Sequence, residues 1–528
     1  MIKTDVRLPY GYTADDIYSA LCERLPIQRE EIKEYRIVKR TLNCSDDKMF
    51  DYSATLAICL SDEREAGLLK MKKKVAIYEG YDLNFPPCHF SSRPLVVGSG
   101  PAGLFATLLL AEVGASPILI ERGLPVEDRV KKVELFTTLG ILDSACNIQF
   151  GEGGAGTFSD GKLKVGSMDK YKFKVLSSLI EAGAPEDILY TVGAHVGTDK
   201  LQNIIQKTRQ KIKDLGGEIF FATKLTELKV IDGNVVGAIA ERGGEVITFD
   251  TDTVVLATGH SAKDTFEMLK NMGVKLEPKG FGIGLRIEHP REYIDRLVYG
   301  DNPPNDIGAA SYHLVTHLPG GRSVYSFCMC PGGSVVAAAS EPLGIVTNGM
   351  SEHARDADNS NAAFLVSVTP SDFGSDDPLS GIALQRSIEQ LAFSVSGANY
   401  KAPSTTMSAF MSVSDATLES SVKPSYPLGV LPISPEKYLP SYITDSLRGG
   451  IVDFDAWMPG FYLGDAILTG PETRTTSPIR VTRSDSFEAV GIRGLYPTGE
   501  GAGYAGGIVS SARDGLMVAE SIIIKHSK

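Results

Sequence analysis

The sequence lacks the long apolar runs of a membrane protein. No stretch approaches the roughly 20 consecutive apolar residues that a membrane-spanning helix requires. Asp5 and Arg7 stand where the apolar core of a signal peptide would lie. We therefore expect a soluble, cytoplasmic protein with no membrane association.

The sequence also has few cysteines and no excess of basic residues. The seven cysteines are scattered and odd in number, which excludes the disulfide framework of a small secreted domain. No cluster of cysteine and histidine has zinc-binding spacing, so no metal site is expected. The net charge of −12 disfavours a general nucleic-acid binder, because neutralising phosphates needs a basic surface.

A glycine fingerprint near residue 100 organises the rest of the chain. The apolar run 95–97 predicts a strand buried on both faces, and it leads directly into Gly98-Ser99-Gly100-Pro101-Ala102-Gly103. This is the pattern G-x-G-x-x-G between a strand and a helix. A second apolar run, 118–120, ends at Glu121, about 20 residues after the glycines. Together these features predict a βαβ unit that binds a dinucleotide.

Each part of the fingerprint has a physical role. Gly98 permits the tight turn, Gly100 lets the backbone approach a diphosphate, and Gly103 lets the helix pack closely on the strand. The unpaired amides and the positive dipole end of the helix favour the diphosphate. Glu121 is placed to accept hydrogen bonds from ribose hydroxyls.

The first 90 residues precede this unit and form a separate module. Their patterning predicts strands at 2–9, 35–42, 51–60 and 75–79, and helices at 13–25 and 62–69. The order βαββαβ is that of a ferredoxin-like fold. Such a module can bind RNA, a small molecule or another protein. We interpret it as a structural or docking module, with a protein partner as one alternative.

Later segments return to the dinucleotide fold. Residues 147–163 are so rich in glycine that we expect their backbone, including Gly154 and Gly156, to contact the cofactor. Residues 198–216 predict an amphipathic helix and residues 218–249 a small β-meander. A buried strand at 253–258 then ends at Gly259.

The C-terminal segment indicates which dinucleotide binds. A strand at 494–498 ends at Gly499-Glu500, and a final helix begins at Gly507-Ile508. The chain thus returns to one cofactor site after a large insertion, residues 262–489, and no second fingerprint is present. A flavin fits this return, because a second helix N-terminus can stabilise negative charge on its pyrimidine edge.

The motifs along nearly the whole chain resemble one family. They are VVGSGPAGLFA, FGEGGAGTFSDGKL, GIGLRIEHP, FCMCPGG, TNGMS, TGPETRTTSPIR and LYPTGEGAGYAGGIVSSARDG. They are similar to those of the bacterial FAD-dependent dehydrogenases, among the flavoproteins of the glutathione-reductase type. The resemblance implies FAD bound through Gly98, Gly100, Gly103 and Glu121, with Arg122 beside the adenosine and Gly499 and Glu500 near the ribityl chain. Glu500 stands where many relatives have Asp, and the resemblance names no substrate.

Five residues are candidates for the chemistry. Cys328 and Cys330 could shuttle electrons as a strained disulfide or form an adduct, or they could be packed residues on one face of a strand. His289 could act as an acid or base, and Arg286 could contact an anion or the flavin. Lys162 could stabilise a reduced flavin or bind a substrate carboxylate. A structural role is the alternative for each.

The sequence therefore predicts an α/β flavoprotein oxidoreductase that acts on a small organic molecule through a tight, non-covalent FAD. Its Rossmann-like FAD-binding domain comprises residues 91–261 and 490–528, with a mixed-sheet substrate or cap domain at 262–489 and the ferredoxin-like module at 1–90. The reductant would be NAD(P)H bound transiently, or the substrate itself. The alternatives are a flavoprotein that acts on RNA and a flavin-bound scaffold or sensor that binds a partner through residues 1–90.

Overall fold

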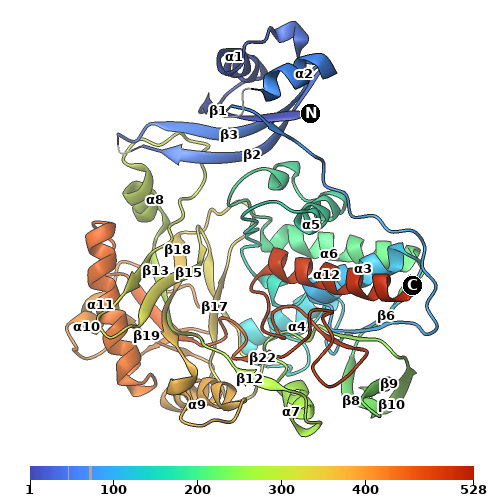
Figure 1. Cartoon of the computed structure of the whole chain (residues 1–528). Helices are drawn as coiled ribbons and strands as arrows, with labels where there is room; N and C mark the ends of the chain where they lie inside the picture. Colours follow the sequence, from blue (N-terminus) through green and yellow to red (C-terminus); the bar gives the residue numbers. More distant parts are fainter. Residues whose placement is uncertain (46, 71–73, 528) are drawn as a thin grey trace.

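Three parts of the chain are distinct in the computed structural model (Figure 1). The structure describes residues 1–45, 47–70 and 74–527. A small N-terminal part lies against two larger parts, one built on a five-stranded sheet and the other on a seven-stranded sheet. The chain passes from the first larger part to the second and then back.

The N-terminal part has the predicted order of strands and helices. Its elements are β1 (Ile2–Pro9), α1 (Ala14–Arg24), the 3-10 helix η1 (Arg29–Glu31), β2 (Glu34–Cys44), β3 (Phe50–Cys59), α2 (Asp62–Leu69) and β4 (Ala76–Ile77). The strands form one sheet in the order β2-β3-β1-β4. Thr13 and Asp16 form a capping box at the start of α1, each side chain accepting from the other's backbone N–H.

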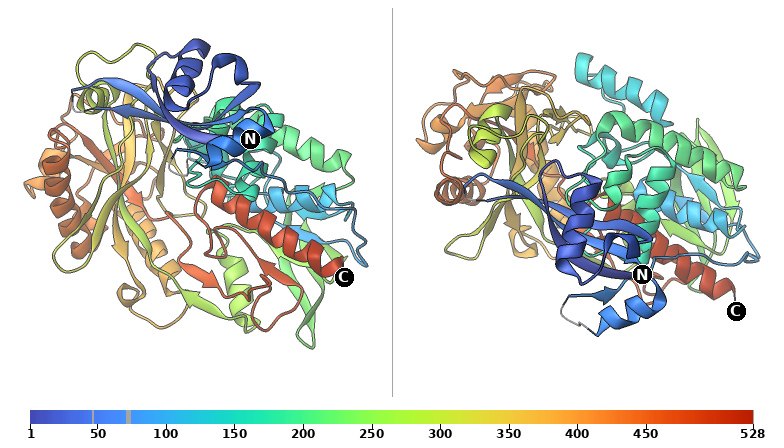
Figure 2. Two further views of the ribbon diagram at one scale, coloured as in Figure 1. Left: turned by 45° about the horizontal axis from the view of Figure 1, so that its top comes forward. Right: turned by 90° about the horizontal axis from the view of Figure 1, so that it is seen from above.

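This part is docked on both larger parts (Figure 2). The Arg40 N–H donates to the Tyr190 carbonyl at 2.7 Å, and the Val192 N–H donates to the Arg40 carbonyl at 2.9 Å. The Tyr10 hydroxyl donates to the Asp306 carboxylate at 2.9 Å. Tyr190 belongs to the first larger part and Asp306 to the second, so these contacts join all three parts.

The five-stranded sheet is parallel throughout, in the order β23-β11-β5-β6-β7. Its short strands are β5 (Leu95–Val97), β6 (Ile118–Ile120), β7 (Glu218–Phe220), β11 (Val254–Leu256) and β23 (Leu495–Pro497). Because β11 lies between β5 and β23, the predicted return of the chain to this sheet is confirmed.

Both faces of this sheet are covered. One face carries the helices α3 (Pro101–Glu112), α5 (Lys170–Glu181), α6 (Thr198–Asp214) and α12 (Ile508–His526), with α3 and α12 side by side. The other face carries an antiparallel meander of β8 (Thr223–Ile231), β9 (Asn234–Arg242) and β10 (Glu245–Asp250). The meander predicted at 218–249 is thus shorter, because residues 218–220 form β7 of the parallel sheet. Val96 therefore packs among helices, while its neighbours Leu95 and Val97 pack towards the meander.

Several elements at the edge of the insertion also belong to this core. They are α7 (Lys263–Asn271), β12 (Leu276–Pro278) and β22 (Ile479–Val481), and β12 pairs with β22. Phe266 of α7 and Val481 of β22 are buried in the same cluster as Leu95. These segments lie within the range 262–489 but pack against the five-stranded sheet.

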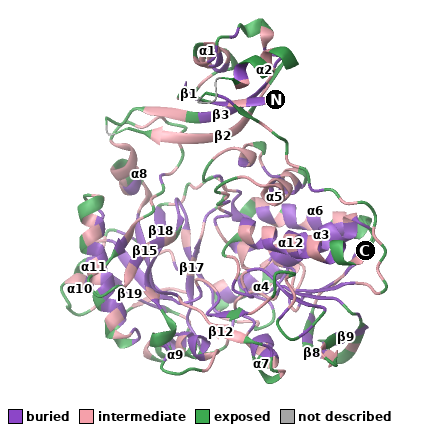
Figure 3. Cartoon of the chain, in the orientation of Figure 1, coloured by how far each residue is buried: buried purple, intermediate pink, exposed green. Residues whose placement is uncertain are grey.

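The seven-stranded sheet is mixed, as predicted. Its order is β14 (Val315–His317), β15 (Ser323–Cys330), β18 (Asn359–Val368), β13 (Phe281–Pro290), β21 (Ile467–Glu472), β19 (Ala402–Thr406) and β20 (Val430–Pro432). Neighbours are antiparallel except β19 and β20. The central strand β13 is buried along nearly its whole length (Figure 3).

Helices and a small hairpin complete this part. They are α8 (Arg291–Tyr299), α9 (Ser380–Val395), α10 (Met407–Met411), α11 (Ser441–Trp457), the 3-10 helices η4 (Pro370–Asp372) and η5 (Pro435–Lys437), and the hairpin of β16 (Ser334–Ala337) and β17 (Thr347–Met350). Buried aromatic residues such as Phe364, Phe454 and Phe461 fill the space between the sheet and α11.

Candidate functional site

A large cavity lies between the parallel strands and the seven-stranded sheet. Its walls enclose about 1590 Å³ of space free of protein atoms, part of which is open solvent. Predicted cofactor-binding residues that line it are Gly98, Gly100, Pro101, Ala102, Glu121, Arg122, Gly154, Gly156, Gly259, Gly499, Glu500, Gly507 and Ile508. The cavity is thus at the carboxyl ends of the parallel strands, where nucleotides bind in open α/β sheets.

The three fingerprint glycines are required for different reasons. At Gly98 the backbone has φ +100°, and a Cβ would lie 2.4 Å from the Ala257 carbonyl oxygen. At Gly103 a Cβ would lie 1.8 Å from the Gly98 carbonyl oxygen, because helix α3 packs so closely on the turn. At Gly100 a Cβ would meet only Gly154 Cα, at 3.8 Å, among the described residues. Gly100 is therefore the position that leaves the backbone open to a ligand.

Two helix N-termini border the cavity. Helix α3 begins at Pro101 with Gly100 as its N-cap, and α12 begins at Ile508 with Gly507 as its N-cap. Neither N-cap contributes a side-chain hydrogen bond. Free N–H groups and the positive dipole ends favour an anion at both places. This arrangement fits a ligand with a diphosphate and a second electron-rich group.

Glu121 holds the fingerprint turn together. One carboxylate oxygen accepts from the Ser99 N–H at 2.9 Å and the Ser99 hydroxyl at 2.8 Å. The other accepts from the N–H groups of Gly123 at 2.9 Å and Gly151 at 3.1 Å. The carboxylate therefore already has four donors from the chain, and its ribose contact stays a prediction. Ser99 lies behind the cavity wall for this reason.

Arg122 lies beside the same wall. Its guanidinium donates to the Asp264 carboxylate at 2.9 Å and lies 4.4 Å from the centre of the Phe150 ring. Both Arg122 and Phe150 line the cavity. The flat guanidinium and ring present the kind of surface on which an adenine can stack.

Arg129, on α4 (Val126–Leu139), shapes the glycine-rich segment, and the sequence analysis did not identify it. Its side chain is fully buried and donates to the carbonyls of Asn147, Ile148, Gly151, Glu152 and Gly154 over 2.6–3.2 Å. Burial lowers its pKa to about 10, so it stays charged at neutral pH. The segment is thus wrapped around a buried cation. The sequence gives no signal that this arginine holds the glycine-rich segment, because its carbonyl partners lie 18 to 25 residues further along the chain.

Arg286 lies behind the opposite wall. It is fully buried and does not itself line the cavity. Its Nε lies 2.9 Å from a Glu472 carboxylate oxygen, and its other nitrogens donate to the Cys328 carbonyl at 2.9 Å and the Asn348 side chain at 3.0 Å. The direct contact of Arg286 with an anion or flavin that the sequence suggested is therefore wrong. Its three partners line the cavity instead.

His289 is likewise not in the cavity. It is fully buried between Tyr293 and Phe461, and its Nε2 lies 3.0 Å from the Phe461 carbonyl. Burial lowers its pKa to about 4, so the ring is neutral at neutral pH. A catalytic acid or base at His289 is excluded by this placement, and the histidine serves the packing of the seven-stranded sheet.

The two cysteines do not share a face of their strand. The register of β15 with β18 shifts between Phe327 and Cys330, and Cys328 has φ +42° in this bulge. Cys328 is exposed towards the cavity, whereas Cys330 is 1% exposed. Both are free thiols. Burial raises the pKa of Cys330 to about 12, and the loss of bulk water inside the cavity raises that of Cys328, so neither is a thiolate at neutral pH.

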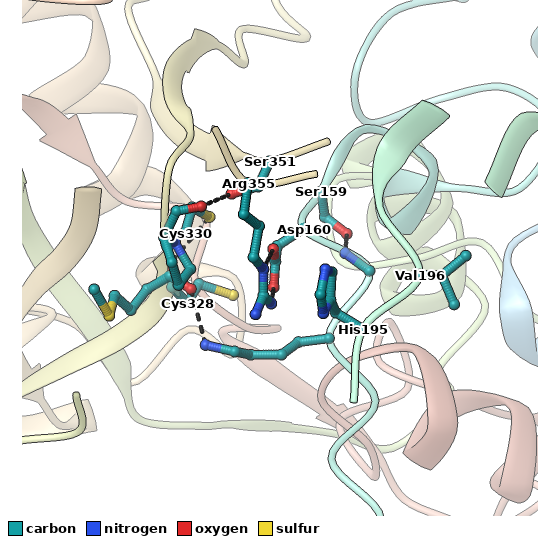
Figure 4. A network of polar contacts seen from close by, with 12 residues as sticks. Ser159, Asp160, His195, Val196, Cys328, Cys330, Ser351 and Arg355 are labelled. Atoms are coloured by element: carbon teal, nitrogen blue, oxygen red, sulfur yellow. Dashed lines mark hydrogen bonds and ion pairs between the residues drawn. The ribbon is translucent and has the colours of Figure 1, made fainter. Parts of the chain in front are cut away.

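Polar contacts join the two walls (Figure 4). The Lys162 ammonium donates to the Met329 carbonyl of β15 at 3.0 Å. The Asp160 carboxylate accepts two hydrogen bonds from the Arg355 guanidinium, one of them at 2.9 Å. Burial lowers the pKa of Lys162. Lys162 thus places its amine in the cavity while it connects the glycine-rich segment to the seven-stranded sheet.

Two carboxylates in the cavity carry strongly shifted pKa values. Burial raises the pKa of Glu472 to about 7, with Arg286 acting against the shift. Burial also raises the pKa of Glu500 to about 7, against the N–H of Gly507 and the charge of Lys279. The sequence analysis did not identify Glu472, whose only signal was its place in the motif TGPETRTTSPIR.

Two kinds of feature are absent from the described residues. Within residues 1–45, 47–70 and 74–527, no helix is long and apolar enough to cross a membrane. In the same residues, no group of three or more histidine, cysteine, aspartate and glutamate side chains could hold a metal ion. The cavity between the sheets is thus the candidate functional site that the geometry supports.

Comparison with known proteins gives three findings. A family model described as "FAD-dependent protein, C-terminal domain-like" matches residues 280–475. A protein of Clostridium beijerinckii, described as uncharacterized, is 44% identical over 512 residues, which cover 96% of this chain and 95% of that protein.

Among solved structures, a geranylgeranyl bacteriochlorophyll reductase-like protein from Thermoplasma acidophilum is 13% identical, with a TM-score of 0.36, over 82% of this chain and 79% of that chain. A 3-ketosteroid dehydrogenase from Rhodococcus jostii is 12% identical, with a TM-score of 0.35, over 84% and 99%. Scores this low carry no information about the reaction of this chain.

Proposed function

Because the chain belongs to the family of FAD-dependent proteins, we propose that it is a dehydrogenase-type oxidoreductase whose FAD occupies the cavity between the two sheets. The substrate would be a small organic molecule bound against the seven-stranded sheet. The observation that carries the proposal is the position of Gly100, which opens the backbone to a diphosphate at the N-terminus of α3. Bound FAD supplies the transfer of two electrons as a hydride.

The residues present fit such a cofactor. The fingerprint Gly98 to Gly103 and the N-terminus of α3 would hold the diphosphate. Arg122 and Phe150 would receive the adenosine. Gly499, Glu500 and the N-terminus of α12, at Gly507 and Ile508, would hold the flavin end, where the helix dipole stabilises negative charge. Gly154, Gly156 and Gly259 would contact the cofactor through their backbone.

Lys162 of the glycine-rich segment and the side chains of the second wall would orient the substrate. In its protonated form, the Lys162 amine would bind an anionic group or offset negative charge next to it. Cys328 is a protonated thiol in the cavity wall, and Cys330 packs behind it. We assign these thiols to the shape of the pocket. The bulge at Cys328 turns its carbonyl towards Arg286 and its side chain to the cavity.

We interpret the N-terminal part as a ferredoxin-like module and propose the divisions 1–90, 91–261, 262–489 and 490–528 for the chain, with α7, β12 and β22 of the third range packed on the five-stranded sheet. The contacts of Arg40 and Tyr10 with both larger parts support a docking role for this module. Through Arg40 on β2 and Tyr10 after β1, this module would keep the two walls of the cavity in fixed positions relative to each other. A role in RNA or partner binding remains the alternative proposed from sequence.

The test begins with the visible spectrum of the purified protein. We expect a yellow protein whose flavin absorbance is bleached anaerobically by NADH, NADPH or one member of a panel of metabolites, and recovers with an acceptor. A folded, colourless protein that takes up no added FAD would refute the proposal. Bound FAD that no reductant in the panel bleaches would favour the scaffold or sensor instead.

A further inference from the structure

Three buried glutamates of the second larger part differ in the hydrogen-bond donors that the chain supplies to their carboxylates. Glu288 accepts from the Ser425 N–H and hydroxyl and from the Asn359 amide, at 2.5–3.0 Å. Glu389 accepts two hydrogen bonds from Arg474, at 2.7 and 2.9 Å, and one from the Thr473 hydroxyl. Neither of these carboxylates lines the cavity.

Glu472 is the exception. It ends strand β21, is 2% exposed and lines the cavity. Among the described residues, no hydrogen-bond donor has good geometry towards its Oε2, although Arg286 Nε lies at 2.9 Å. Oε2 is occupied by this ion pair, but the described residues supply no other side-chain contact to the Glu472 carboxylate, which leaves the group in the wall available to a ligand bound in the cavity.

Arg286 fixes this carboxylate from behind. Two of its nitrogens are held by the Cys328 carbonyl and the Asn348 side chain, which come from two other strands, β15 and β17. The guanidinium therefore cannot turn into the cavity. It keeps the Glu472 carboxylate at one place in the wall, close to Cys328 and opposite the glycine-rich segment.

From this geometry we propose that Glu472 is the acid–base residue of the cavity, which exchanges a proton with the substrate, and that Arg286 is its positioning residue. The inference rests on the proposed oxidoreductase function. In the direction of oxidation, a C–H bond of the substrate breaks and its electron pair leaves with the hydrogen as a hydride to FAD. A neighbouring O–H or N–H bond breaks, its proton passes to Glu472, and its electron pair forms the new double bond to carbon.

The charge around Glu472 suits proton exchange at neutral pH. Burial raises its pKa to about 7, and the opposing charge comes from Arg286 on β13. The other titratable groups coupled to it are Cys328 and Tyr325 on β15, and both are neutral because burial raises their pKa values. Acid and base forms are therefore both populated near neutrality, which is the condition for efficient general acid–base catalysis.

The experiment compares the full-length wild type with Glu472→Gln and Glu288→Gln. The second variant is the matched control, because it also replaces a buried carboxylate on a neighbouring strand but lies outside the cavity. Infrared difference spectra are recorded as the pH is raised from about 5 to about 9, a range that brackets neutrality. The midpoint potential of bound FAD is measured over the same range.

We expect a protonated carboxylic-acid band in the wild type that is lost as the pH rises through about 7. Glu500 contributes to the same band, so the band should be smaller in Glu472→Gln than in the wild type and unchanged in this range in Glu288→Gln. The slope of the potential against pH should change near the same pH, and this change should be reduced in Glu472→Gln and kept in Glu288→Gln. A Glu472→Gln protein with the band and slope of the wild type would overturn the proposal.

Arg286→Lys provides a second variant in case Glu472→Gln does not fold. Because Arg286 lowers the pKa of Glu472, a shorter and more distant cation should let the band persist to higher pH. A band that titrates as in the wild type would overturn the positioning role. If the protein binds no FAD, the proposed function fails visibly, whereas the infrared titration still decides whether Glu472 holds the proton.

Discussion

The two walls of the cavity are built in different ways. The wall of the parallel sheet presents backbone, at Gly98, Gly100 and Gly154, and its key positions fall within one short motif and one glycine-rich segment. The opposite wall presents side chains, Asn348 and Glu472, from strands that are distant in sequence and joined by Arg286. A wall made of backbone is encoded by a short local motif in the sequence. A wall made of side chains is encoded by residues that are far apart in the sequence.

The largest expected effect concerns the buried arginine that holds the backbone of the first wall in shape. Arg129→Met leaves a set of buried carbonyls without donors and should destabilise the protein by about 3 to 5 kcal/mol, the scale for removing one member of a buried charged network. The fraction of protein that binds FAD should fall as the stability falls. The measurement is urea unfolding followed by circular dichroism.

Lys131→Met on the same helix is the control for Arg129. Its side chain is 72% exposed and should change stability by less than about 0.5 kcal/mol. Equal stability of the two variants would show that the glycine-rich segment keeps its shape without the buried cation.

The next effect separates two glycines of the fingerprint. Gly103→Ala should destabilise the fold by about 3 kcal/mol or more, at the upper end for overpacking, because its Cβ would overlap the Gly98 carbonyl. Gly100→Ala should fold almost as the wild type, since its Cβ meets only Gly154 at 3.8 Å among the described residues. Thermal unfolding of both apo-proteins checks this, and similar losses at the two positions would contradict the distinction.

This difference explains what the sequence could predict. The βαβ unit depends on neighbours a few residues apart, and β11 and β23 each carry a local pattern of a buried strand that ends in glycine, so these elements were readable although their pairing is long-range. The roles of Arg129 and Glu472 depend on partners that only the folded chain brings near. The bulge in β15 also left no sequence signal, so the expectation that Cys328 and Cys330 share a face was wrong.

A smaller effect is expected at Glu121, which connects the fingerprint to the glycine-rich segment. Glu121→Gln replaces two acceptor positions by a donor that faces the Ser99 or glycine N–H groups. FAD affinity should fall by about 1 to 3 kcal/mol, the scale for hydrogen bonds to a charged group. Titration of the apo-protein by flavin fluorescence measures it, with the exposed Glu134→Gln as control. Unchanged affinity would remove Glu121 from the site.

The smallest effect is expected at the thiols of the second wall. The Cys328→Ser, Cys330→Ser double variant should accept the same two electrons per FAD in anaerobic titration as the wild type, since both cysteines are free and protonated. Four electrons in the wild type and two in the variant would identify a redox-active pair. That result would make the second wall an electron carrier in addition to a binding surface.

The most direct test of the account is FAD binding by Gly100→Val compared with the wild type. The valine side chain would project into the space next to the N-terminus of α3, where the diphosphate is expected, while the turn itself remains intact. Titration of the two folded apo-proteins should show tight, saturable FAD binding by the wild type and little or none by the variant. Equal binding by both proteins would contradict the placement of FAD in this cavity.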